Sequence, residues 1–86
     1  MKLDTEHMNI VARKAAEVFK AMGWRWYVKN NKRVDAYIPD VLDIRDTLAQ
    51  LTKNIGGSVV SSSTGRLHAR VIKDGGETFI NYFITL

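Results

Sequence analysis

A chain of 86 residues forms one domain with a modest core, because a chain of this size buries only about 60–65% of its unfolded surface. Its hydrophobic fraction of 45% and charged fraction of 26% exclude disorder of the whole chain. The absence of cysteine excludes disulfides, thiolate catalysis and cysteine-ligated zinc, and the net charge of +4 permits an anionic partner without requiring one.

The N-terminal stretch predicts an amphipathic helix over residues 4–22. Apolar residues recur there at three- and four-residue steps, which places them on one side of a helix. Asp4 or Thr5 can cap its start, and Gly23 follows its last apolar residue, where glycine commonly ends a helix.

Residues 24–28 and 34–38 alternate in polarity and predict a β-hairpin. Trp24 and Trp26 share one face of its first strand, where they serve either as core anchors or as surfaces for stacking bases; in a domain this small the core is the preferred interpretation. The hairpin tip is basic. Its cations are Lys29, Lys32 and Arg33.

A second helix is expected over residues 41–54. Asp40 follows a proline and is the candidate N-cap, with Asp43 three residues further on in capping-box spacing. Leu48 lies in the middle of the apolar stripe of this helix, and a pair of glycines, Gly56 and Gly57, ends it.

The C-terminal stretch, residues 57–86, predicts three strands. Residues 61–65 form the first connecting turn, and the second lies within residues 74–77. With Gly75–Gly76 as the turn, Val71 faces Ile80; with Asp74–Gly75 as the turn, the register slides by two, and the same faces still match.

The two faces of this C-terminal ribbon differ in chemistry. One is apolar and is expected to join the core: Leu67, Ala69, Val71, Ile80, Tyr82, Ile84 and Leu86. The other interleaves basic, aromatic and amide residues: Arg66, His68, Arg70, Ile72, Phe79, Asn81, Phe83 and Thr85. The second face suits the phosphates and bases of single-stranded nucleic acid, an acidic partner protein, or simply the solvent.

The element order is helix, two strands, helix, three strands. Two amphipathic helices can pack side by side on one face of an antiparallel sheet, so we expect an α+β two-layer sandwich. The other face of the sheet is then left open.

The sequence offers no constellation typical of catalysis. His7 and His68 are the only histidines, and the arginines beside His68 would repel a metal ion. The hydroxyls of residues 61–64 have no base at a useful spacing, and no glycine loop opens a helix as a phosphate cradle would. We therefore expect no enzymatic activity, no metal and no cofactor.

Three segments together are similar to known sequences. The order Tyr37-Ile38-Pro39-Asp40, then Asp43-Ile44-Arg45-Asp46-Thr47-Leu48, then Ser62-Ser63-Thr64-Gly65-Arg66-Leu67 resembles small uncharacterised proteins carried by phages and prophages, over residues 37–72. The resemblance implies an accessory protein of a phage or mobile element, a class that often acts by binding a host component. It supplies no functional residues.

Our first hypothesis is a non-catalytic binding module that engages nucleic acid or a nucleoprotein complex. Its arginines would pair with phosphates and its phenylalanines would stack on bases. The expected contact residues are Arg66, His68, Arg70, Phe79, Phe83, Lys29, Lys32 and Arg33.

The alternative is a protein–protein module, either an inhibitor of a host protein or a self-associating domain. Phe79, Phe83 and Ile72 would then form the centre of the interface with the arginines as its rim, or edge strands would pair in a homodimer. No apolar run approaches the ~18 residues of a membrane span, and the first residues lack a signal-peptide core, so we expect no membrane association and a cytoplasmic location, in the host if the protein is phage-derived.

Overall fold

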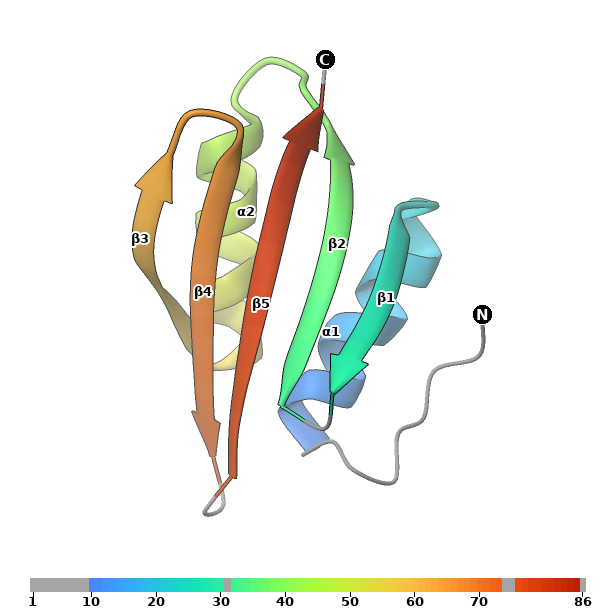
Figure 1. The fold of residues 1–86 in the computed structure, drawn as a ribbon, viewed down its shortest axis with the longest axis vertical. Coiled ribbons are helices and arrows are strands. Elements are labelled where there is room, and N and C mark those ends of the chain that lie inside the picture. Colours follow the sequence, from blue (N-terminus) through green and yellow to red (C-terminus); the bar gives the residue numbers. More distant parts are fainter. Residues whose placement is uncertain (1–9, 31, 74–75, 86) are drawn as a thin grey trace.

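The computed structural model describes residues 10–30, 32–73 and 76–85. Two helices and five strands follow one another in the predicted order (Figure 1). They are α1 (Ile10–Met22), β1 (Arg25–Asn30), β2 (Arg33–Pro39), α2 (Ile44–Ile55), β3 (Gly57–Ser63), β4 (Arg66–Lys73) and β5 (Gly76–Thr85). None of the helices in this described part of the chain has the length and apolar character needed to cross a bilayer.

The strands form one mixed sheet in the order β1-β2-β5-β4-β3. The prediction of a wholly antiparallel sheet is wrong at one place, because β2 and β5 are parallel. The reason lies in the connection: α2 carries the chain back across the sheet, so β3 runs in the direction of β2 (Figure 1). After two antiparallel reversals β5 runs that way too, and it lies beside β2.

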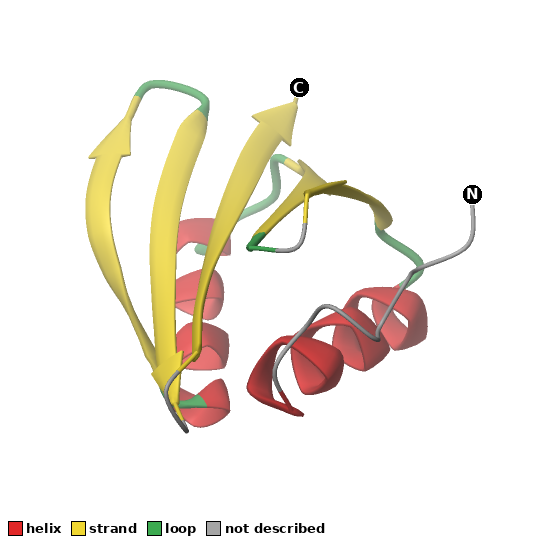
Figure 2. Cartoon of the chain, turned by 60° about the horizontal axis from the view of Figure 1, so that its bottom comes forward, coloured by secondary structure: helices red, strands yellow, loops and turns green. Residues whose placement is uncertain are grey.

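Both helices cover the same face of the sheet, as Figure 2 shows, and the core lies between the two layers. The predicted apolar face of the C-terminal ribbon is confirmed as core, except that Ile84 is only partly buried and Leu86 lies outside the described residues. Trp24 and Trp26 are half-buried and pack against this core, which confirms their predicted role as core residues. The fully or nearly fully buried apolar side chains include Phe19, Ala36, Ile38, Leu48, Val71, Ile80 and Tyr82.

The start of α2 differs from the prediction, because the helix begins at Ile44 and not at residue 41. The predicted N-cap of α2, Asp40, instead continues the sheet, because its backbone N–H donates to the carbonyl of Thr85 (2.7 Å). The N-cap is Asp43, which has a left-handed backbone (φ 61°) and makes no side-chain cap hydrogen bond, so the capping-box prediction is wrong. The predicted caps of the first helix, Asp4 and Thr5, lie outside the described residues.

The C-terminal ribbon follows the second of the two predicted registers. Val71 pairs with Thr78, and Lys73 with Gly76, which leaves residues 74–75 between the strands and outside the described residues. The serines of residues 61–63, which the sequence assigned to a turn, extend β3 instead.

Candidate functional site

The face of the sheet away from the helices is uncovered, and Figure 1 looks directly onto it. Because β1, β2, β5 and β4 are paired in register, its side chains fall into three rows that cross the strands. The aromatic row is Arg25, Tyr37, Phe83 and Arg66. The amide row is Tyr27, Asp35, Asn81 and His68. The arginine row is Arg33, Phe79 and Arg70.

Three members of the aromatic row, Tyr37, Phe83 and Arg66, are stacked on one another. The rings of Tyr37 and Phe83 are nearly parallel, with centroids 5.2 Å apart, and the guanidinium of Arg66 lies over Phe83 at 5.7 Å. Tyr27 meets Tyr37 edge-on at 5.6 Å, and its hydroxyl accepts a hydrogen bond from Arg25 (3.2 Å). This hydrogen bond raises the pKa of Arg25 above its ordinary value. Its guanidinium is charged at any working pH in any case, so the end of the row at β1 carries a positive charge.

The amide row contains a buried carboxylate. Asp35 is 1% exposed, and its Oδ1 accepts hydrogen bonds from Asn81 Nδ2 (3.1 Å) and Arg33 Nε (3.0 Å). Lys29 Nζ lies 3.8 Å from its Oδ2. A buried carboxylate is tolerated only when it is paired and hydrogen-bonded, and these three partners meet that need.

The arginine row repeats the contact between arginine and aromatic ring. The guanidinium of Arg70 lies over Phe79 at 5.8 Å and also 3.6 Å from the carboxylate of Glu77. Both charged side chains of that ion pair are more than a third exposed, so the pair contributes little stability and Arg70 is available to a ligand.

A shallow depression, which we call the furrow, lies over the amide row between the other two rows. It is lined by Asn30, Lys32, Arg33, Arg66, His68, Phe79 and Asn81. Its floor is polar, formed by Asn81, which is 6% exposed, and the half-buried His68. Its margins are cationic and aromatic. At the β3 end the row continues into Ser61, which is exposed and pairs with His68.

Charge alone does not single out this face. Its described residues include six cationic side chains and two carboxylates, but the two helices also have five cations against two carboxylates. The difference is that one of the two sheet carboxylates, Asp35, is buried and that the arginines alternate with aromatic rings. The open sheet face is therefore a basic-aromatic surface, whereas the helix surface is merely basic.

The structure brings the predicted site residues together around the furrow. Arg66, His68 and Phe79 line it, as do Lys32 and Arg33 from the hairpin tip. Arg70 and Phe83 lie in the neighbouring rows, and Lys29 forms an ion pair with Asp35.

Sequence reasoning missed Arg25, Tyr27, Tyr37, Asp35 and Asn81 as site residues. The alternation of the first hairpin already placed Arg25 and Tyr27 opposite the tryptophans. The decisive fact, the parallel pairing of β2 with β5, leaves no local signal in the sequence. That pairing sets Tyr37 beside Phe83 and Asp35 beside Asn81.

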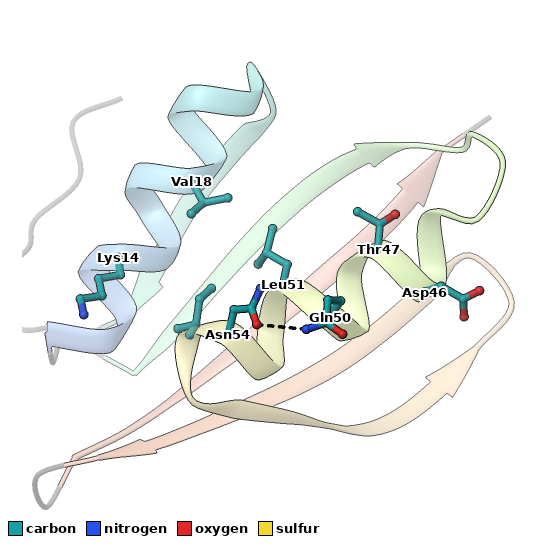
Figure 3. A pocket seen from close by; sticks show the side chains of 8 residues that line it. Lys14, Val18, Asp46, Thr47, Gln50, Leu51 and Asn54 are labelled. Atoms are coloured by element: carbon teal, nitrogen blue, oxygen red, sulfur yellow. Dashed lines mark hydrogen bonds between the residues drawn. The ribbon is translucent and has the colours of Figure 1, made fainter.

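A second concavity lies on the opposite side of the molecule, between the two helices (Figure 3). Val18 of α1 and Leu51 of α2 project into it, and its polar rim includes Gln50, whose Nε2 donates to Asn54 Oδ1 (3.0 Å). Its surface is mainly apolar, and none of the described residues that line it is aromatic. Within the described ranges, no three histidine or carboxylate side chains lie close enough to hold a metal ion.

Comparison with known protein families, with curated proteins and with solved structures found no match. The resemblance of residues 37–72 to phage proteins therefore stays a prediction, and function has to be argued from the geometry of the open face.

Proposed function

We propose that this protein is a non-catalytic module that binds single-stranded nucleic acid on its open sheet face. The observation that carries the proposal is the row arrangement itself: two rows in which arginines lie on aromatic rings flank a row of hydrogen-bonding groups. Single strands offer three matching features, namely phosphates, ring faces and unpaired base edges. A duplex offers only the first of these to a flat sheet.

The faces of Phe83 are occupied in the free protein, by Tyr37 on one side and Arg66 on the other. A cation–π contact at an exposed site contributes only about 0.5–1 kcal/mol. A base stacked on an aromatic ring contributes about 1–3 kcal/mol. A base can therefore displace the guanidinium of Arg66, which then reaches a phosphate, and the same exchange applies to Arg70 and Phe79.

Three cations of this face, Arg25, Lys32 and Arg66, form no ion pair within the part of the chain that the structure describes. They are the first candidates for phosphate contacts. If three or four phosphates are neutralised on a single strand, the logarithm of the affinity should fall against the logarithm of salt concentration with a slope of about −2 to −3.

A protein partner is the second candidate, because Ile72, on the same face of β4, is 58% exposed. Phe79 and Phe83, the predicted apolar centre of such an interface, are less available to a protein partner, however, because they are half-buried beneath arginines. An interface of this kind would depend on apolar contact and would therefore change little with salt.

The test is a fluorescence-anisotropy titration with single-stranded and double-stranded DNA and RNA of mixed sequence, at low and high salt. The proposal predicts binding that favours single strands and weakens steeply with salt. Absence of binding at low salt would contradict it. Pull-down of a protein partner that stays bound at high salt and is lost when Ile72 is replaced by Asp would favour the second candidate.

A further inference from the structure

Asn81 is an unusual side chain for an open sheet face, because it lies in the middle of that face and is only 6% exposed. Its Nδ2 donates to Asp35 Oδ1 (3.1 Å). A carboxylate can only accept hydrogen bonds, so the amide cannot be turned around, and its Oδ1 is fixed as the atom directed away from Asp35.

The fixed oxygen accepts no hydrogen bond from any residue that the structure describes. No interaction of Asn81 Oδ1 appears among the described residues, and none of their buried side-chain polar atoms is without a partner. The oxygen therefore reaches solvent, and it does so on the floor of the furrow. It is a pre-oriented hydrogen-bond acceptor, held by a buried partner and bordered by Phe79, Arg33 and Arg66.

The fixed oxygen can pair only with a donor. The carboxylate of Asp35 lies on the other side of the amide, where Arg33 and Lys29 pair with its charge, so the Asn81 oxygen itself decides which group of a base can pair at this point of the floor. Cytosine and adenine present an exocyclic amino group on their pairing edge, whereas uracil and thymine present two carbonyls around a single N–H. A carbonyl brought to this floor would meet another oxygen and leave it unpaired, which is costly.

We propose that the furrow is a base-edge subsite in which Asn81 Oδ1 accepts from the exocyclic amine of a base, so that the protein prefers cytosine over uracil in a single strand. Arg66, Arg33 and Lys32 contact the flanking phosphates. This inference rests on the proposed nucleic-acid function and adds selectivity to it. Asp35 acts as a positioning residue, because it is buried and acts on the ligand through Asn81 and Arg33, to which it is hydrogen-bonded.

The experiment compares homopolymeric deoxycytidine and deoxyuridine strands of about 12 nucleotides, which are long enough for one binding face. The two pyrimidines have the same size and differ on the edge that Asn81 would read. At pH 8 the wild-type protein should bind the cytidine strand about fivefold or more tightly, which is the range of a single good base contact. The Asn81→Ala variant should bind both strands equally.

The matched control is Asn54→Ala, which removes an exposed amide on α2, on the other side of the molecule, and should leave the preference unchanged. If Asn81→Ala fails to fold by circular dichroism, Asp35→Asn serves instead. The new amide at residue 35 carries no negative charge, and it allows the Asn81 amide to turn around. The preference for the cytidine strand should therefore shrink even though Asn81 is intact. A preference that survives in the variant that folds would overturn the inference.

The outcomes separate the two proposals. Equal wild-type affinity for the two strands, together with steep salt dependence, would overturn the base-edge subsite and leave the proposed function in place. No binding of either strand at low salt would overturn both. Deoxycytidine monophosphate is titrated alongside, and if it binds as tightly as the strand, the ligand is a free nucleotide and the inference of a strand is wrong.

Discussion

Tyr82 is the largest side chain that the core buries completely. The hydroxyl of Thr52 donates its only proton to the carbonyl of Leu48 (2.7 Å). In the 3.1 Å contact between Thr52 and Tyr82, the hydroxyl of Tyr82 is therefore the donor. Phe19 meets the tyrosine ring edge-on at 6.0 Å. Burial raises the pKa of Tyr82 to about 12, because an ionised phenolate in the core would lack solvation.

This shift predicts a loss of stability at alkaline pH. In the unfolded chain the tyrosine ionises near pH 10, whereas in the folded protein it keeps its proton up to about pH 12. Unfolding therefore releases a proton in this interval, and the free energy of unfolding should fall by up to about 1.4 kcal/mol per pH unit. Below pH 10 the tyrosine keeps its proton in both the folded and the unfolded protein, so this titration does not reduce the free energy of unfolding there.

The measurement is urea unfolding between pH 9 and pH 12 for the wild type and for Tyr82→Phe, in which this titration is absent. At pH 9 the variant should be less stable than the wild type by about 0.5–1.5 kcal/mol, the usual contribution of a hydrogen bond, and its free energy of unfolding should then decline less steeply with rising pH. Parallel decline of the two proteins would contradict a buried, protonated Tyr82.

Among the elements, β3 and β4 approach each other closely where α2 leads into the sheet. Gly56 closes the helix with a left-handed backbone (φ 102°), and Gly57 starts β3 beside β4, where it pairs with Val71. A Cβ at Gly57 would lie 2.7 Å from the carbonyl oxygen of Arg70 and 2.7 Å from Cγ2 of Val71. The sequence marked both glycines as a helix stop but gave no reason for the second one.

Gly57→Ala should therefore destabilise the protein by about 1–3 kcal/mol, because the contact is with backbone that cannot easily move. Chemical denaturation measures this directly. Ser58→Ala, at the exposed neighbouring position, is the control and should change the free energy of unfolding by less than about 0.5 kcal/mol. Equal stability of Gly57→Ala and the wild type would mean that β3 does not approach β4 this closely at Gly57.

The apolar stripe of α2 gives a second prediction at this scale. Leu48 is 0% exposed, so Leu48→Ala should reduce the free energy of unfolding by about 2–5 kcal/mol. The control is Leu42→Ala, which makes the same chemical change at a loop residue that is 91% exposed. It should reduce the free energy of unfolding by less than about 0.5 kcal/mol. Similar losses in the two variants would contradict the burial of this stripe.

For the whole molecule, local patterns predicted the elements and their order, because each helix and strand has its own period and its own stop signals. They also predicted which side of the C-terminal ribbon is core. The capping of α2 was not predictable, since the hydrogen bond from Asp40 to Thr85 joins residues far apart in the sequence. The same is true of the parallel pairing of β2 with β5.

That distant pairing also decides how much of the site could be predicted. Arg66, His68, Arg70, Phe79 and Phe83 alternate on one local ribbon, so their common face follows from the sequence alone. The stack of Tyr37 on Phe83 and the hydrogen bond from Asn81 to Asp35 cross between β2 and β5. These two contacts between β2 and β5 arrange the basic surface into rows with a furrow between them, and they can be seen only in the folded structure.

We propose that the open sheet face, and not the general basicity of the protein, binds single-stranded nucleic acid. The most direct test compares two double variants by anisotropy at low salt: Arg66→Gln with Arg70→Gln on the sheet, and Lys20→Gln with Lys53→Gln on the helices. Each pair removes two positive charges from exposed positions. Both proteins should stay folded, because exposed cation–π contacts contribute only about 0.5–1 kcal/mol each.

The sheet variant should lose about tenfold or more in affinity, equivalent to about 1.4 kcal/mol, and should have a shallower salt slope. The helix variant should stay within about threefold of the wild type, since it changes only the long-range charge. Equal losses in the two variants would contradict binding on the open sheet face, because affinity would then follow net charge and not the arrangement of that face.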